Sequence, residues 1–249
     1  MAIYIISHKP IKCFELKGYQ LIQVGAYNKE HYCNFSDDIG DNISNKNPYY
    51  CELTGLYWIW KNLTDEYIGI VHYRRFFTES FFESHFLKET KIKKIFQKYD
   101  VILPIKTKLK NTTVRNQFLD NTGTEYDLDI LESVLKDKYP DYLDTYKQIF
   151  NGNTSYYRNM FITSKKIYDT YCEWLFDILD EVESRMDISK YNDYHKRIYG
   201  FLAERLLGVF MQHNHYKIYE AGVVQIDLKQ NLIKRFIKRW QRLLYSIYQ

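Results

Sequence analysis

The sequence YIGIVHYRRFF, residues 67–77, opens with an apolar run rich in β-branched residues, which is typical of a buried strand. Four consecutive residues end this run: His72, Tyr73, Arg74 and Arg75. Ligands of α/β proteins bind outside the carboxyl ends of the strands, and guanidinium groups match phosphate oxygens as forked donors. The stretch therefore predicts an anion clamp of Arg74 and Arg75, with His72 and Tyr73 as neutral donors. The alternative is structural, with one arginine in solvent and the other in an ion pair.

Strand and helix patterns alternate along the rest of the chain. Apolar, β-branched or aromatic runs predict strands at residues 2–7, 19–26, 67–72, 99–104, 155–163 and 216–221. Helical patterns predict helices at residues 48–63, 79–98, 127–138, 140–150, 165–185 and 192–213, while residues 105–125 have the pattern of a polar loop. This alternation indicates an α/β fold, a sheet flanked by helices, with a helical C-terminal part.

The composition indicates a globular domain without a zinc or disulfide framework. Of the 249 residues, 45% are hydrophobic and 27% are charged, which is enough for one large core. The four cysteines form no C-x-x-C pair and lie at no metal-like spacing from a histidine. Residues 1–10 do not have the pattern of a signal peptide, and no run of about 18 apolar residues occurs, so we expect a cytoplasmic protein.

Two further segments are candidates for nucleotide contact. The polar loop 34–47 leads into Asn47-Pro48, which we interpret as a helix N-cap followed by proline at the first helical position. A helix N-terminus attracts anions, although a capped structural helix explains the pattern too. Glu52 lies early on this helix and can hydrogen-bond a ribose or complement the dipole. His8 and Lys9 end the first predicted strand, where α/β proteins bind ligands; the alternative for His8 is a structural role.

The last predicted helices carry charged residues whose role the spacing leaves open. Residues 191–207 contain Asp193, His195, Arg197 and Glu204. Arg197 and Glu204 are seven positions apart, so they share one face of a helix. That face could line a site, but the same spacing also fits a face in solvent or one whose charges pair with each other. The sequence contains no G-x-x-x-x-G-K-[ST] and no G-x-G-x-x-G motif, which argues against a P-loop NTPase and a dinucleotide enzyme, and no G-x-S-x-G motif occurs either.

Five blocks of the sequence resemble one known family. They are GDNISNKNPYYCELTGLYWIWKN (40–62), YIGIVHYRRFF (67–77), YYRNMFI (156–162), YCEWLFDIL (171–179) and RIYGFLAERLL (197–207). In this order they are similar to bacterial glycosyltransferases of capsule, exopolysaccharide and lipopolysaccharide synthesis, a family long known as a domain of unknown function that includes galactofuranosyltransferases. The resemblance runs from residue 3 to about residue 210.

The resemblance implies a GT-A-like nucleotide-sugar-binding domain over residues 1–228. Many GT-A enzymes carry an Asp-x-Asp metal motif where this chain has YIGIVHYRR, so the resemblance implies that Arg74 and Arg75 neutralise the leaving diphosphate without a metal cofactor. The alternative ligands for a divalent metal, Mn²⁺ or Mg²⁺, are Asp37, Asp38 and Asp41. By the same resemblance, Asn47 and Glu52 contact uridine or ribose, with His8 and Lys9 nearby.

An inverting transfer needs a carboxylate that takes the proton of the acceptor hydroxyl. Glu204 is our first candidate for this base and Asp193 our second. We therefore expect a transferase that moves a hexose, for instance galactofuranose, from a UDP-sugar to a lipid-linked surface-polysaccharide intermediate. The alternatives are a non-catalytic nucleic-acid-binding module, in which arginines and tyrosines hold single strands, and an inactive membrane scaffold for other polysaccharide enzymes.

Residues 229–249 are expected to form a separate basic amphipathic helix. They carry six basic residues and no acidic one, so removing them changes the formal charge from +4 to −2 and leaves the main body without global support for nucleic-acid binding. Within residues 231–249 the apolar side chains fall on one helical face. Such a helix can lie on an anionic membrane surface, here the cytoplasmic face of the cell membrane, or dock onto the domain itself.

Overall fold

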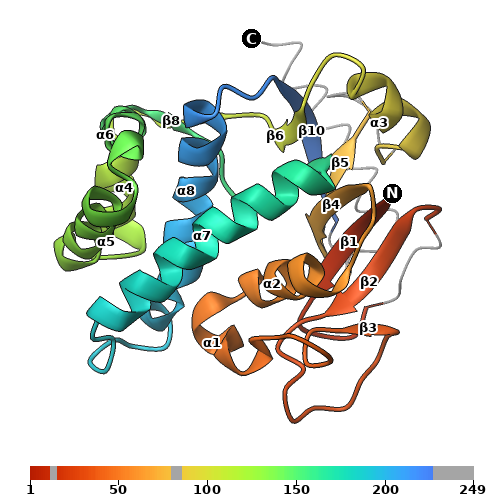
Figure 1. Cartoon of the computed structure of the whole chain (residues 1–249), viewed down its shortest axis with the longest axis horizontal. Coiled ribbons are helices and arrows are strands. Elements are labelled where there is room, and N and C mark those ends of the chain that lie inside the picture. Colours follow the sequence, from red (N-terminus) through yellow and green to blue (C-terminus); the bar gives the residue numbers. More distant parts are fainter. Residues whose placement is uncertain (12–15, 80–85, 227–249) are drawn as a thin grey trace, which may run out of the picture.

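The computed structural model describes residues 1–11, 16–79 and 86–226, and it shows an α/β domain (Figure 1). The strands are β1 Ala2–Ser7, β2 Tyr19–Gln23, β3 Phe35–Ser36, β4 Tyr67–His72, β5 Arg75–Thr78, β6 Val101–Pro104, β7 Thr107–Lys108, β8 Thr154–Ser155, β9 Phe161–Ser164 and β10 Ile218–Gln225. The helices are η1 Ser44–Lys46, α1 Asn47–Tyr50, α2 Leu53–Asn62, α3 Glu89–Ile95, α4 Val114–Asn121, α5 Glu125–Lys138, η2 Pro140–Tyr142, α6 Leu143–Asn151, α7 Lys165–Arg185, η3 His195–Arg197 and α8 Ile198–His213. The predicted fold, a sheet flanked by helices with a helical C-terminal part, is confirmed.

The main sheet is mixed, with parallel strands in its first half. Its strand order is β3-β2-β1-β4-β5-β10-β6-β9, and β4 also pairs with β9. β1 is parallel to both β2 and β4, which places Ile5 between Leu21 and Val71. β5 follows β4 in a tight antiparallel hairpin, and β10 runs antiparallel to β5 but parallel to β6. The carboxyl ends of β1, β2 and β4 therefore meet at one edge, the usual position of a ligand site.

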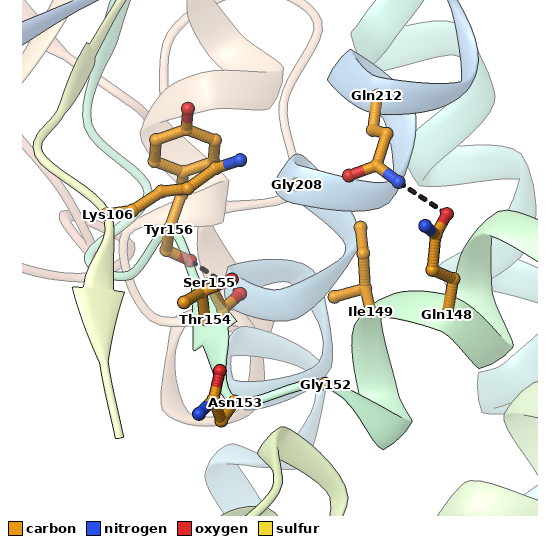
Figure 2. A pocket seen from close by; sticks show the side chains of 10 residues that line it. All are labelled: Lys106, Gln148, Ile149, Gly152, Asn153, Thr154, Ser155, Tyr156, Gly208 and Gln212. Atoms are coloured by element: carbon orange, nitrogen blue, oxygen red, sulfur yellow. Dashed lines mark hydrogen bonds between the residues drawn. The ribbon is translucent and has the colours of Figure 1, made fainter. Parts of the chain in front are cut away.

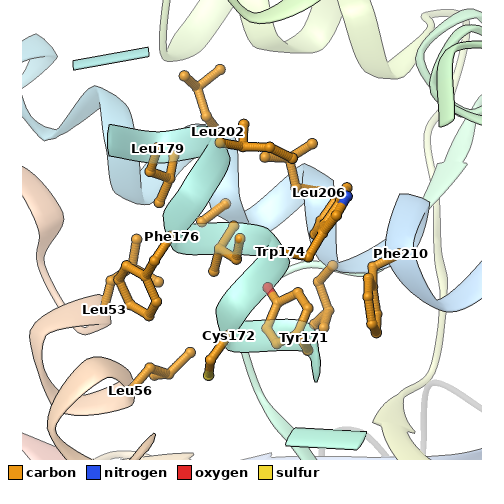
Figure 3. Close-up of a cluster of buried hydrophobic side chains, with 14 of the residues drawn as sticks. Leu53, Leu56, Tyr171, Cys172, Trp174, Phe176, Leu179, Leu202, Leu206 and Phe210 are labelled. Atoms are coloured by element: carbon orange, nitrogen blue, oxygen red, sulfur yellow. The ribbon is translucent and has the colours of Figure 1, made fainter. Parts of the chain in front are cut away.

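Both faces of this sheet are buried, which explains the continuous apolar runs in the sequence. Tyr4 and Ile6 of β1 pack into the larger core, whereas Ile3 and Ile5 point into a smaller core on the opposite face. Helices α2, α7 and α8 cover the larger core, and their side chains meet around α7 (Figure 3). Helix α3 covers the smaller core with Ile92. This packing fixes the sheet edge on which the polar residues lie.

Two predicted helices are wrong in extent. The helix predicted at 48–63 breaks at Cys51, whose φ of 53° and ψ of −127° end α1 before α2 begins. Asn47 is the first residue of α1 rather than its N-cap, because the 3₁₀-helix η1 leads directly into it. Of the helix predicted at 79–98, residues 80–85 lie outside the described residues, and the described part is helical only in α3, Glu89–Ile95.

Two further predictions, for residues 105–125 and 155–163, differ from the structure. Residues 105–125 contain helix α4, which the sequence pattern does not reveal because only Val114 and Phe118 of this mainly polar helix are buried. The strand predicted at 155–163 divides into β8 and β9, with an irregular segment between them. The amphipathic helix predicted at 231–249 lies outside the described residues. Within the described ranges, no helix is long and apolar enough to cross a membrane.

Candidate functional site

The β4–β5 hairpin presents the arginines at the carboxyl edge of the parallel strands. His72 pairs with Arg75 across the hairpin, so Tyr73 and Arg74 form its turn. The backbone N–H of Tyr73 donates to the carbonyl of Ile6 over 3.1 Å, which continues the hydrogen-bonding between this turn and the end of β1. Arg74 is exposed. The strand therefore delivers the arginine side chains to the edge where the sequence predicts them.

Cationic side chains surround the ring of Tyr73. The Lys9 ammonium lies 5.0 Å and the Arg74 guanidinium carbon 4.9 Å from the ring centroid, both within cation–π range. The His8 ring meets the same tyrosine edge-on at 5.3 Å between centroids. Burial lowers the pKa of His8, and the positive charges of Lys9, Arg74, Lys29 and Arg197 lower it further. His8 is therefore neutral near pH 7, and its surroundings attract an anion.

These cations have no carboxylate partner of their own. Among the residues that the structure describes, no Asp or Glu lies within ion-pair distance of the basic groups at this edge: Lys9, Lys29, Arg74, Arg75, Arg158 and Arg197. Arg75 also lowers the pKa of Arg158, after burial, because the two positive charges repel each other. An electropositive edge of this kind has the charge that a diphosphate needs.

A strained loop between β8 and β9 completes the edge. Arg158 and Asn159 both have positive φ, 86° and 45°, which is uncommon for residues with a side chain. Such conformations cost about 1–3 kcal/mol each and cluster at functional sites. The side-chain amide of Asn159 donates to the Glu52 carboxylate over 2.9 Å, and its own amide oxygen is buried without a partner. Neither residue was singled out from the sequence, because the segment was predicted to be a continuous strand.

The main chain of Arg158 is held from both sides. Its N–H donates to the Glu204 carboxylate over 2.6 Å. Its carbonyl is in close contact with Nε2 of His72, and because a carbonyl can only accept, this contact requires a proton on Nε2. Glu52, His72 and Glu204, which the sequence proposes separately, are thus joined through the Arg158–Asn159 loop.

The break between α1 and α2 places Glu52 in this group. Cys51 at the break accepts a hydrogen bond from the Arg197 guanidinium over 3.1 Å, which links the break to the start of α8. Asn47 donates from its side-chain amide to the Cys51 carbonyl, 2.7 Å, and to the Thr54 hydroxyl, 3.0 Å. Both of these bonds brace the break. A contact between Asn47 and a nucleotide stays a prediction.

Glu204 has the surroundings of a group that exchanges a proton. Its side chain is 23% exposed, and its second oxygen lies 3.1 Å from the Arg205 guanidinium. Burial raises the pKa of Glu204, and the negative charge of Glu52 raises it further, while Arg205, the N–H of Arg158 and His72 act in the opposite direction. A carboxylate that is buried beside a second carboxylate has a higher pKa than an isolated one and therefore stays protonated to a higher pH.

Arg205 forms a buried ion pair that holds the Glu204 carboxylate. It is only 1% exposed, and its guanidinium donates to the Phe201 carbonyl and to Gln117, both over 2.9 Å. The charge also lies over the rings of Phe118 and Tyr157, at 5.2 and 5.4 Å. Removing one partner of a buried ion pair is costly, so this arrangement keeps Glu204 in place. Its role was not visible in the sequence, where Arg205 is one charge on an apolar helix.

Asp193 and the three aspartates of the polar loop lie in other surroundings. The Asp193 side chain is fully exposed, and its carboxylate is 3.8 Å from the Lys196 ammonium. Asp37 is buried and accepts hydrogen bonds from four neutral donors, Asp38 accepts from Ser36 and contacts His31, and Asp41 accepts from Tyr57. Within the described ranges, no group of three or more His, Cys, Asp or Glu side chains is arranged to hold a metal ion. The three aspartates of the polar loop thus take part in hydrogen bonds within the fold, and metal binding by them stays a prediction.

The architecture resembles that of a solved glycosyltransferase structure. The chain superposes on the apo structure of the bifunctional glycosyltransferase WbbM with a TM-score of 0.82 and 30% sequence identity, over 91% of this chain and 45% of that one. Its fold is therefore that of a glycosyltransferase domain. The chain belongs to the family described as Domain of unknown function (DUF4422), whose sequence profile matches residues 2–215. No curated protein matches the chain significantly.

Proposed function

We propose that this protein transfers a hexose from a UDP-sugar to a surface-polysaccharide intermediate carried on a lipid. The observation that carries the proposal is the juxtaposition of unpaired cations with Glu204 at the carboxyl edge of β1 and β4. A sugar nucleotide needs cations for its diphosphate, and an attacking hydroxyl needs a base. The similarity to a glycosyltransferase structure supports the same reaction class. Galactofuranose, suggested by the family resemblance, is the first donor sugar to test.

The cations act on the leaving group. When the bond between the anomeric carbon and the diphosphate breaks, negative charge develops on the phosphate oxygens. Arg74 in the hairpin turn and Arg75 at the start of β5 stabilise this charge with forked N–H donors. Lys9 and the guanidinium of Arg158 add positive charge from the two flanking segments. This set of charges supports a transfer that needs no divalent cation.

Glu204 acts on the acceptor. The carboxylate takes the proton of the acceptor hydroxyl as the oxygen attacks the anomeric carbon, which inverts the configuration. Its raised pKa makes it a stronger base than a glutamate in water. The hydrogen bond from the N–H of Arg158 and the ion pair with Arg205 fix its orientation. Glu204, rather than the exposed Asp193, is therefore the proposed base, while Glu52, His8 and Asn47 are the proposed contacts to the nucleoside.

A calorimetric titration of UDP with EDTA present tests the donor site. We expect micromolar binding to the unaltered protein and a loss of about a hundredfold in Arg74→Ala, because a charge-assisted hydrogen bond contributes about 1.5–3 kcal/mol. Arg115→Ala is the matched control, since Arg115 pairs with Glu125 on the surface of α4. Binding that appears only when Mn²⁺ is added would overturn metal independence. No binding in either condition would overturn the proposed function.

Transfer itself is tested with labelled UDP-sugars, including UDP-galactofuranose, and lipid-linked or soluble saccharide acceptors. A glycosidic product whose formation depends on Glu204 confirms an enzyme. UDP binding without transfer to any acceptor of a broad panel would instead identify an inactive scaffold. Attachment to an anionic membrane through residues 231–249 is proposed on the sequence pattern, and vesicle co-sedimentation of the full chain tests it.

A further inference from the structure

A pocket of about 290 Å³ lies beside α8, apart from the proposed donor site (Figure 2). Its floor is formed by the buried residues Ile149, Ser155, Tyr156 and Gly208. Its rim carries the exposed polar side chains of Lys106, Gln148, Asn153 and Thr154, and the half-buried Gln212 lies beside Gln148 (Figure 2). The pocket is therefore open to solvent at a polar rim and closed at a partly apolar floor.

This pocket and Glu204 share one face of α8. Glu204, Gly208 and Gln212 are spaced four residues apart, so each lies about 6 Å further along the same side of the helix. The β8–β9 segment follows this face in the opposite direction, because Ser155 and Tyr156 adjoin Gly208 while the N–H of Arg158 reaches Glu204. A ligand in the pocket would thus lie roughly one helical turn from the proposed base.

Gly208 keeps the pocket open. Glycine in the interior of a helix costs about 1 kcal/mol relative to alanine. A Cβ at this position would make only ordinary contacts, 3.8 Å from Ser155 Oγ and from Tyr156 Cδ2, so close packing does not require glycine here. What a larger side chain would do is occupy the pocket. The position therefore provides space rather than tight helix packing.

The lining has the chemistry of a saccharide site. Side-chain amides and hydroxyls form most of it, and one ammonium, that of Lys106, lies 5.0 Å from the centroid of the Tyr156 ring. None of the lining residues is acidic. Gln148 and Gln212 hydrogen-bond each other over 2.8 Å and keep their remaining amide groups for a ligand rich in hydroxyls. The volume is at the lower end of the range for small-molecule sites, so it suits one sugar ring rather than a sugar nucleotide.

We propose that this pocket binds a sugar unit of the acceptor chain next to the one that is glycosylated. That it binds saccharide follows from its own lining, whereas its role as an acceptor subsite rests on the function proposed above. A sugar held here positions the next unit of the chain along α8 toward Glu204. The pocket thus contributes to acceptor choice, while the cationic edge selects the donor.

Methyl NMR spectroscopy of the full chain tests the proposal. Ile149 lies in the floor, so its δ1 methyl group, labelled with ¹³C and assigned with Ile149→Val, reports on occupancy. The probes are methyl α-D-galactopyranoside, methyl α-D-glucopyranoside and N-acetylglucosamine, with glycerol as the non-sugar control. We expect at least one sugar to shift this signal and to saturate at millimolar concentrations. In Gly208→Leu the affinity should fall by at least about tenfold, because the leucine fills the site.

Two control variants separate loss of the pocket from loss of the fold. Gly208→Ala should retain binding, since its Cβ fits at contact distance. The double variant Gln148→Ala, Gln212→Ala removes both members of an exposed hydrogen bond, leaves no buried group unpaired, and should weaken binding on a folded protein. An unshifted Ile149 signal, an equal shift with glycerol, or unchanged binding in Gly208→Leu would overturn the proposal.

UDP titration of the same samples distinguishes this result from a failure of the proposed function. Gly208→Leu should bind UDP as the unaltered protein does. UDP binding without a sugar-dependent shift overturns the subsite and leaves the donor site in place. A sugar-dependent shift without UDP binding leaves the saccharide pocket and overturns the transferase.

Discussion

Asp37 and Glu204 are both carboxylates withdrawn from solvent, yet their surroundings differ in kind. Asp37 is fully buried and accepts from the backbone N–H groups of Gly25 and Ala26 and from the hydroxyls of Ser44 and Thr54. Glu204 is 23% exposed, accepts one backbone N–H and faces both a cation and a second carboxylate. The first environment uses every oxygen lone pair, while the second leaves some of them available.

This difference distinguishes a carboxylate that is fully engaged in the fold from the one proposed for catalysis. Four donors fix the Asp37 carboxylate in a single arrangement, so the group ties the end of β2 to α2 and has no capacity left for a ligand. The Glu204 carboxylate keeps access to solvent and an elevated affinity for a proton. The number of donors, more than the depth of burial, separates the two roles.

The largest expected effect is on catalysis in Glu204→Gln. The transfer rate should fall by about 10²–10⁴-fold, the usual contribution of a general base, because glutamine cannot take the acceptor proton. UDP affinity and secondary structure should persist, since the amide oxygen can still accept from the N–H of Arg158, and Arg205 still donates to the Phe201 carbonyl and to Gln117. The free energy of unfolding should fall, because Arg205 loses its carboxylate partner. Radiolabel transfer and calorimetry on the same preparation measure both quantities. A rate within a few-fold of the unaltered protein would remove Glu204 from the mechanism and with it the comparison.

The second effect is on stability in Asp37→Ala. The free energy of unfolding should fall by about 3–5 kcal/mol, because four buried donors lose their common acceptor and unsatisfied buried groups cost about 1–3 kcal/mol each. Urea unfolding followed by circular dichroism provides the measurement. The control is Asp41→Ala, which removes an exposed carboxylate that accepts from the Tyr57 hydroxyl and should change stability by less than about 1 kcal/mol. Equal losses in both variants would contradict a special structural role for Asp37.

The third effect is on the pH dependence of transfer. A base acts only when ionised, so kcat/KM falls as the pH drops through its pKa, and the raised pKa of Glu204 places this acidic limb above that of an ordinary glutamate. Removing the negative charge of Glu52 in Glu52→Gln should move the limb to lower pH. Glu89→Gln on the surface of α3 should leave it in place. An acidic limb that moves to higher pH in Glu52→Gln would show that the negative charge of Glu52 does not raise the pKa of Glu204.

The smallest effect is expected for Cys51→Gly, at the helix break that precedes Glu52. Glycine adopts the backbone angles of Cys51 without strain, which offsets its greater entropy loss on folding and the lost contact between Cys51 and Arg197. We expect a gain of about 0.5–1 kcal/mol in unfolding free energy with UDP affinity retained. A thermal denaturation series measures the change, and a loss of stability would indicate that the thiol contributes more than the strain costs.

Long apolar elements of this fold were predictable from the sequence, and strained ones were not. β1, β4, β6 and α7 follow from apolar patterns that both local propensity and burial favour. The helical break at Cys51 interrupts a continuous helical pattern in the sequence. Tertiary contacts of Glu52 and Arg197 stabilise the unfavourable backbone conformation there, and the periodicity of the sequence carries no sign of such contacts. Helix α4 was not predicted because only two of its side chains are buried, so its sequence lacks an apolar helical pattern.

The sequence was enough to predict several residues of the candidate site, but not which of them contact one another. The end of β4 and the charged helix α8 each carry a visible signal, and His72, Arg74 and Glu204 follow from it. The Arg158–Asn159 loop, which joins His72 to Glu204, has an apolar, aromatic sequence on both sides and therefore resembles a strand. Asparagine, which tolerates a left-handed conformation, was the one local sign that the chain turns there.

The last hydrogen bond of the described chain has a consequence for acceptor delivery. The N–H of Ile226 donates to the carbonyl of Arg74 over 2.7 Å, so the described part of the chain ends beside the proposed diphosphate clamp. Any surface that holds residues 231–249 is thereby tethered within a few residues of the donor, which raises the effective concentration of an acceptor embedded in that surface. Truncation after Ile226 should accordingly slow transfer to a vesicle-bound acceptor far more than transfer to a soluble glycoside.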